Sequence, residues 1–130
     1  MPPDIAALRQ PLAETLGIEI LEAAKEKVIG RLVVRPDICT SGHTLHGGAI
    51  MAFADTLAAT GAFLNVPDGA GTTTIESKTN FIGGAKEGST VIGESTPNHV
   101  GRRTSVWTTK ITREDGKLVA IVTQSQMVLT

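Results

Sequence analysis

Two groups capable of chemistry lie eight residues apart in one apolar stretch of this chain. Gly47 and Gly48 follow His46, and Asp55 stands eight residues after Gly47. Asp55 is the only residue with a formal charge between positions 38 and 67. A carboxylate in apolar surroundings is costly to bury and normally becomes neutral or finds partners. The pattern therefore predicts a functional reason for an acid at this position.

The glycines mark the expected start of a helix. The first backbone N–H groups of a helix have no intrahelical partner. Glycine lets a ligand approach those groups closely, and the helix dipole favours negative charge there. Such a site could stabilise an oxyanion that develops on a carbonyl. The alternative is that Gly47 and Gly48 only form a tight turn into the helix.

Gly47 and Asp55 would be roughly 12 Å apart along one helix at ~1.5 Å per residue, so one carbonyl could not easily reach both. If both act on one carbonyl, they must come from two copies of the chain, with antiparallel helices facing each other and two equivalent sites per dimer. Asp55 would then attack the carbonyl or deprotonate a water. The alternatives are a partnered core carboxylate, or a cap on a helix that begins at Thr56.

Other polar groups nearby carry weaker signals. His46 could steer a carbonyl or a leaving group, or simply hydrogen-bond a loop. His43 and His46 lack a third ligand, so we expect no metal site. Cys39, the single cysteine, is expected to be an inert thiol in a reducing compartment. Arg102 and Arg103 could grip phosphates or form a solvated turn, and on a strand their side chains would diverge.

The composition excludes several classes of protein. Twelve basic and thirteen acidic residues give a net charge of −1, and aromatic residues are few, which argues against nucleic-acid binding. The N-terminus lacks the pattern of a signal peptide. Residues 49–66 are marginal in length for a membrane span and carry Asp55. We expect one domain over residues 1–130, cytoplasmic, with no membrane partner.

The order of elements predicts an antiparallel sheet curled around one buried helix. A helix that is apolar on every side belongs in a core. Poor alternation at 118–123 indicates a strand shielded on both faces, by the helix and by a neighbouring subunit. The expected elements are a short amphipathic helix at 4–15, strands at 17–22 and 27–34, the central helix at 47–64, and strands at 72–82, 89–97, 103–113 and 117–128.

Several of these segments together resemble a known family. They are Leu45-His46-Gly47-Gly48, Ala54-Asp55, residues 74–82, Gly101-Arg102-Arg103-Thr104 and Gly116-Lys117-Leu118-Val119-Ala120. They resemble hotdog-fold acyl-CoA thioesterases, near the phenylacetate-degradation and 4-hydroxybenzoyl-CoA branches, over residues 17 to 129. The resemblance implies an α+β hotdog fold, with a long central helix wrapped by a curved antiparallel sheet. It also implies homodimers, paired again into tetramers.

The resemblance implies catalytic roles for five positions. Asp55 is similar to the family's acid, a nucleophile or general base, and Gly47 to the backbone donor supplied by the other subunit. His46 resembles the motif histidine near the thioester, and Thr74 falls where some relatives orient the water. Thr40 departs from the family, in which Asn or Gln is common at this place. Its hydroxyl could still hydrogen-bond a water or carboxylate, but it reaches less far.

The same resemblance implies how the substrate binds. Arg102, Arg103 and Gly48 are expected to contact the coenzyme A moiety, which belongs to the substrate, so no separate cofactor is implied. The acyl group is expected in an apolar pocket beside the helix, lined partly by Met51, Phe53, Leu57 and Phe63 or by their partner-subunit counterparts.

The sequence thus predicts an acyl-CoA thioesterase that hydrolyses an aryl or medium-chain acyl-CoA. One alternative is a protein that binds acyl-CoA without hydrolysing it, which the departure at Thr40 keeps open. Another is a hotdog enoyl-CoA hydratase, which would be expected to use an Asp-His or His-Glu pair instead of this motif.

Overall fold

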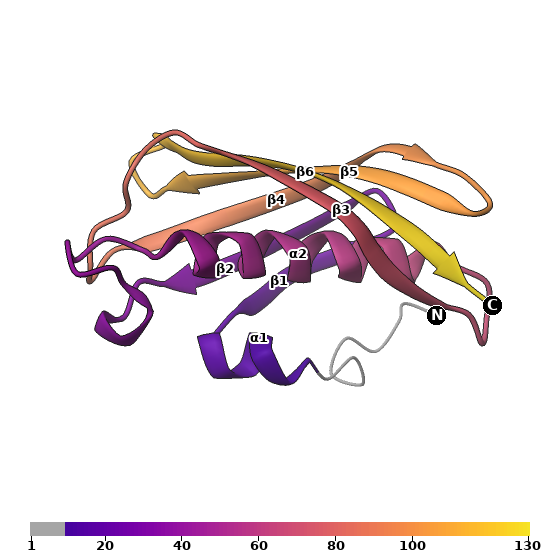
Figure 1. Cartoon of the computed structure of the whole chain (residues 1–130), viewed down its shortest axis with the longest axis horizontal. Helices are drawn as coiled ribbons and strands as arrows, with labels where there is room; N and C mark the ends of the chain where they lie inside the picture. The colour runs from indigo at the N-terminus through magenta and orange to yellow at the C-terminus, as the bar shows by residue number, and fades with distance from the viewer. Residues whose placement is uncertain (1–9) are drawn as a thin grey trace.

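A long helix lies along one face of a six-stranded antiparallel sheet in the computed structural model, which describes residues 10–130 (Figure 1). The sheet has the order β1-β2-β4-β5-β6-β3. This confirms the predicted α+β class and the predicted order of elements. The elements are α1 (Pro11–Leu16), β1 (Glu19–Ala24), β2 (Lys27–Val33), η2 (Pro36–Ile38), α2 (Gly47–Leu64), β3 (Gly71–Phe81), β4 (Thr90–Val100), β5 (Thr104–Arg113) and β6 (Leu118–Leu129).

Glycines on the strands let α2 lie close to the sheet. A Cβ atom at Gly93 would lie 2.6 Å from the side chain of Leu57, and one at Gly30 would lie equally close to the same residue. Leu57 and Phe53 are completely buried in the core. Further along the helix, Gly61 leaves room for the ring of Trp107, which is also fully buried. The inner side of the helix is therefore committed to packing against the sheet.

The limits of several elements differ from those predicted; β1, for example, spans Glu19–Ala24 rather than 17–22. The structure describes the second part of the helix predicted at 4–15. α1 begins at Pro11, because proline suits the first helical position, where no N–H is needed, and it ends at Leu16. The predicted part at 4–9 lies outside the described residues. β4 continues through residues 98–100, which we had assigned to a connection, because a register shift between Pro97 and His99 lets strand pairing resume after the proline.

The side of α2 that carries Met51 and Phe63 is apolar and is only partly covered within the described chain. Met51 and Phe63 are 37% and 40% exposed. Among residues 10–130, α2 alone is long and apolar enough to cross a membrane by length and composition, and half of it is buried inside the domain. The core helix of a folded domain passes the same test.

β3 forms one edge of the sheet and is the longer of the two edge strands. It pairs with β6 along its whole length, and its other side has no strand partner among the described residues. Ile75 and Phe81 on this strand are more than half exposed. A long edge strand with exposed apolar side chains is a ready template for pairing with another chain. The charged residues at this edge are Glu76 and Lys78.

Candidate active site

Asp55 projects from the middle of α2 toward β3 and β6, where two side chains hold one of its oxygens. Thr74 on β3 donates its hydroxyl hydrogen to Asp55 Oδ1 at 2.5 Å, and Gln124 on β6 donates Nε2–H to the same oxygen at 2.9 Å. No residue in the described part of the chain donates to Oδ2. Because α2 is continuous from Gly47, the idea that Asp55 caps a helix starting at Thr56 is wrong.

Two buried glutamines complete this cluster, and the sequence analysis missed both. Gln124 and Gln126 are each 1% exposed and lie on the inward face of β6, in one row with Val122. Gln126 Nε2 donates to Thr74 Oγ1 at 2.9 Å. Thr74 therefore accepts from Gln126 while its own hydrogen goes to Asp55. The available signal was two glutamines at a spacing of two, on the inward face of an otherwise apolar strand.

His46 forms the N-terminal cap of α2. Its Nδ1 accepts a hydrogen bond from Gly48 N–H at 2.8 Å, so the neutral ring carries its hydrogen on Nε2. Gly48 N–H is thus engaged within the chain. No described residue accepts a hydrogen bond from Gly47 N–H, which is the first helical position and lies at the positive end of the helix dipole.

Gly47 and Asp55 stand at opposite ends of the same flank of β3. A Cβ atom at Gly47 would lie 3.2 Å from the ring of Phe81, near the end of β3, whereas Asp55 contacts Thr74, near its beginning. β3 therefore runs opposite to α2, as Figure 1 also shows. A single chain does not bring the free N–H and the carboxylate together.

Thr40, Arg102 and Arg103 make no hydrogen bond to Asp55 within the described chain. Thr40 Oγ1 accepts from Gly42 N–H at 3.2 Å and lies 3.2 Å from Thr44 Oγ1, so its hydroxyl is engaged in its own loop. Arg102 and Arg103 are exposed in the bend between β4 and β5. Their roles stay predictions.

The arginine pair lies at the same end of the sheet as Asp55. Val128 N–H donates to the Arg103 carbonyl at 2.8 Å, and Val128 pairs with Thr72 at the start of β3. Thr72 is two residues from Thr74, which holds Asp55. The pair is therefore near the acid-bearing end and far from the Gly47 end of its own helix.

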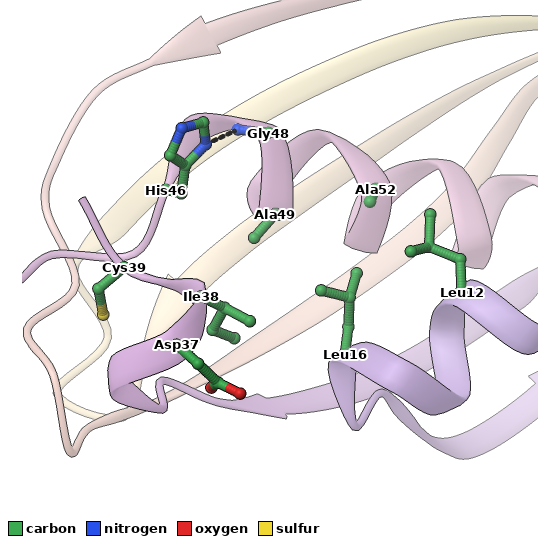
Figure 2. A pocket seen from close by; sticks show the side chains of 9 residues that line it. All are labelled: Leu12, Leu16, Asp37, Ile38, Cys39, His46, Gly48, Ala49 and Ala52. Atoms are coloured by element: carbon green, nitrogen blue, oxygen red, sulfur yellow. Dashed lines mark hydrogen bonds between the residues drawn. The ribbon is translucent and has the colours of Figure 1, made fainter.

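A pocket of about 290 Å³ opens on the opposite flank of α2, between that helix and α1 (Figure 2). Leu12 and Leu16 of α1 face Ala49 and Ala52 of α2 across it, and His46 lies at its upper end. The four residues expected to line an acyl pocket are not among its walls. Of these, Phe53 and Leu57 belong to the core, while Met51 and Phe63 are on the exposed side of α2.

Cys39 borders this pocket, and its thiol donates to the Arg35 carbonyl at 3.2 Å. Burial raises the pKa of the Cys39 thiol, and the charges of Glu87 and Asp37 raise it further. A raised pKa leaves little of the reactive thiolate at neutral pH. Within residues 10–130, no three His, Cys, Asp or Glu side chains are placed to hold a metal ion.

Comparison with known proteins identifies first the fold and then the family. The chain superposes on the Haemophilus influenzae thioesterase HI1161 with a TM-score of 0.90 and 23% identity, covering 100% of this chain and 93% of that one. The Escherichia coli PaaI protein of the phenylacetic acid degradation operon gives a TM-score of 0.89 and 20% identity, covering 97% and 89%. These similarities establish the hotdog fold.

Sequence similarity establishes the family. A 1,4-dihydroxy-2-naphthoyl-CoA hydrolase of Listeria monocytogenes is 32% identical over 110 residues, covering 85% of this chain and 89% of that protein. Residues 42–120 match the family described as the Thioesterase superfamily. The chain belongs to the Thioesterase superfamily, a family of thioester hydrolases, as the resemblance predicted.

Proposed function

We propose that this protein hydrolyses an acyl-CoA to the free acid and coenzyme A, with Asp55 as the general base or the nucleophile. The observation that carries the proposal is the hydrogen bonding of Asp55. Oδ1 accepts from Thr74 and Gln124, whereas Oδ2 has no donor in the described chain. A carboxylate held by one oxygen presents the other to a water or to a carbonyl carbon.

In the general-base route, Oδ2 removes a proton from water while the water oxygen bonds to the thioester carbon. The carbonyl oxygen becomes an oxyanion that accepts a hydrogen bond from Gly47 N–H. The intermediate collapses with cleavage of the carbon–sulfur bond, and the proton on Asp55 passes to the leaving thiolate. In the nucleophilic route, Oδ2 bonds to the thioester carbon and the carbon–sulfur bond breaks, so that coenzyme A leaves as the thiolate and a mixed anhydride remains. Water then hydrolyses the anhydride to the free acid and the Asp55 carboxylate, and its second proton passes to the thiolate.

The Gly47 that meets Asp55 comes from a second copy of the chain. Within one chain, Gly47 lies beside Phe81 at the end of β3, and Asp55 lies beside Thr74 near its beginning. When two such strands pair antiparallel about a two-fold axis, each Asp55 end lies beside the Gly47 end of the other copy. The exposed apolar residues of β3 and the partly covered side of α2 favour this pairing. A homodimer therefore builds two equivalent sites, and pairing of dimers into tetramers is the wider assembly that we propose.

Substrate binding follows from the same arrangement. Arg102 and Arg103 lie at the acid-bearing end, where their guanidinium groups offer fork-shaped donors to coenzyme A phosphates. The pocket beside Gly48 and Ala52, at the partner's Gly47 end, offers apolar walls to the acyl group. Aryl or medium-chain acyl groups fit that chemistry. We propose that the reaction takes place in the cytoplasm, because a single unpaired cysteine suits a compartment in which thiols stay reduced.

The position of the two-fold axis can be tested by charge reversal on β3. Glu76 and Lys78 flank Ser77 on one face of the strand, so an axis at Ser77 sets Glu76 opposite the partner's Lys78, twice per dimer. Each such pair is worth roughly 0.2–1 kcal/mol. Lys78→Glu or Glu76→Lys is expected to raise the dimer Kd by up to roughly 30-fold, and the double reversal is expected to restore it. Sedimentation over a dilution series measures this.

The charge-reversal experiment tests the dimer and the position of its axis separately. A native chain that sediments as a monomer of 13.6 kDa would contradict the dimer itself. A dimer that is insensitive to both single reversals would contradict only the axis at Ser77.

The enzymatic function is tested with a panel of aryl- and fatty acyl-CoAs. We expect release of free coenzyme A thiol from at least one class, above the rate without protein. Because Cys39 is a thiol, Cys39→Ser protein provides the matched background for a thiol-reactive dye. Tight binding of the panel without turnover would contradict hydrolysis.

One observation favours a second candidate, a protein that binds acyl-CoA without hydrolysing it. Thr40 carries a hydroxyl where the resemblance leads us to expect an amide, and that hydroxyl is engaged with Gly42 and Thr44. If the amide's contact is made only in the transition state, its loss slows turnover and leaves substrate binding unchanged. The same panel, read by calorimetry as well as by thiol release, distinguishes the two functions.

A further inference from the structure

We propose that Gln124 is a positioning residue that fixes the orientation of the Asp55 carboxylate, with one oxygen held by its donors and the other left for the substrate, an inference that rests on the role proposed above for Asp55. Gln124 is 1% exposed, and its Nε2 lies 2.9 Å from Asp55 Oδ1. It belongs to β6, whereas the other donor to that oxygen, Thr74, belongs to β3. Two separate strands therefore fix one carboxylate oxygen.

The orientation of the Gln124 amide follows from its neighbours. An ionised carboxylate can only accept hydrogen bonds, so the atom facing Asp55 must be the donor Nε2. The opposite amide atom, Oε1, is buried and has no hydrogen-bond partner among the described residues. A flipped amide would set Oε1 against the carboxylate and would lose the only side-chain hydrogen bond that Gln124 makes among the described residues.

This arrangement is poor for stability alone. A buried polar atom without a partner costs free energy, whereas an apolar side chain at this inward position would incur no such cost. Val122 and Ala120 occupy the same inward row of β6 and show that apolar residues fit it. Positions that break a local packing rule are those where function is expected. The buried amide of Gln124 therefore costs stability, and among the described residues the one group to which it donates is Asp55.

Gln124 supplies what Thr74 cannot. A hydroxyl hydrogen rotates about its C–O bond, so Thr74 could follow either oxygen of Asp55 if the carboxylate turned. The planar amide of Gln124 is held in the core and donates in one direction. Rotation of the carboxylate out of its present plane would lose this bond, so one oxygen stays with the donors and the other stays toward the substrate. Accurate placement of a reacting group is worth up to about 10²-fold in rate.

The test is Gln124→Met, which keeps an unbranched side chain of similar length and removes the donor. We expect kcat to fall roughly 10–100-fold, the loss seen when a group orienting a catalytic residue is removed, with KM close to native. Thr109→Val is the matched control, because Thr109 is completely buried on β5 and donates to Ser95 Oγ at 3.0 Å, away from Asp55. The control is expected to lower Tm without changing kcat.

Gln124→Leu provides a second variant without the donor, in case the methionine disturbs folding. Its apolar side chain suits the inward row of β6 that Val122 also occupies, and kcat is expected to fall as far as in the methionine variant. A native kcat in either folded variant, with only Tm lowered, would overturn the proposal and leave Gln124 a packing residue.

Combination with Asp55→Asn separates this inference from the proposed function. If Gln124 acts through Asp55, Gln124→Met added to Asp55→Asn is expected to lower kcat no further. A further loss in the double variant would show that Gln124 acts elsewhere. If Asp55→Asn alone hydrolyses acyl-CoA at the native rate, the proposed function fails, whatever the Gln124 variants do.

Discussion

Asp55→Asn is expected to reduce kcat for acyl-CoA hydrolysis by roughly 10³-fold, within the 10²–10⁴-fold range typical of a lost general base. Asparagine has the same shape as aspartate, so its Oδ1 can still accept from Thr74 and Gln124. Those two donors then direct the Nδ2 amide to the place of Oδ2. An amide nitrogen there can neither take a proton from water nor attack a carbonyl. The fold and the dimer are expected to remain native.

Steady-state kinetics on the best substrate of the panel measure this loss, and calorimetry with the same acyl-CoA measures the retained affinity. Thr56→Ala is the matched control, because Thr56 is the next residue on α2 and its hydroxyl, among the described residues, bonds only to the Ala52 carbonyl of the same helix. Its kcat is expected to stay close to native. An Asp55→Asn protein with native kcat would remove Asp55 from the mechanism.

The sequence was sufficient for the fold because its main signals are local and strong. The apolar run from Ala49 to Leu64 predicts a buried helix, which must pack against a sheet in a chain of this size. The β-branched segments on either side of it supply that sheet. The strand limits were less certain. A β-bulge after Pro97 lets β4 extend, and a bulge is a compromise between neighbouring strands that no short segment encodes alone.

The site was only half accessible to sequence reasoning. Asp55 was visible because a lone charge breaks an apolar pattern, and Thr74 followed from the family resemblance. Gln124 and Gln126 gave no such contrast, because a glutamine on a strand is usually a solvated residue. Only the register of β6 against β3, which turns both glutamines inward, shows that they meet Thr74 and Asp55.

His46 illustrates a different limit. The motif predicted a ring near the substrate, and the structure adds that its Nδ1 accepts a hydrogen bond from Gly48 N–H as a helix cap. Ser, Thr, Asp and Asn are the usual residues for that position, so a histidine cap is not a signal that a pattern search expects. The cap has a consequence for Gly47. It engages the second N–H of the helix and leaves the first one for a ligand.

Gly47→Pro is expected to reduce kcat by about 10²–10³-fold, the typical cost of losing one oxyanion donor. Gly47 is the first residue of α2, where proline is well tolerated because its missing N–H has no helical partner. His46 already has the φ of −62° and ψ of 138° that a residue before proline prefers. The substitution therefore removes one hydrogen-bond donor and leaves the helix intact.

Gly47→Ala is the matched control for the added side chain. Its Cβ would meet the ring of Phe81 at 3.2 Å, so the ring must shift by a few tenths of an ångström. The alanine variant keeps the N–H, so its kcat should lie close to the native value. It should exceed the kcat of the proline variant by most of the expected 10²–10³-fold factor, which is about the cost of one oxyanion donor. Equal rates in the two variants would mean that the N–H has no part in catalysis.

Mixed dimers of Asp55→Asn and Gly47→Pro chains test whether the two groups come from different subunits. In such a dimer, one site would combine both defects, and the other would pair a native Asp55 with a native Gly47. Random mixing places half of the chains in mixed dimers with one working site of two, so about one quarter of native activity should return. Dimers purified through two different tags should reach about one half. If each chain completed its own site, every site would carry a defect and no activity would return.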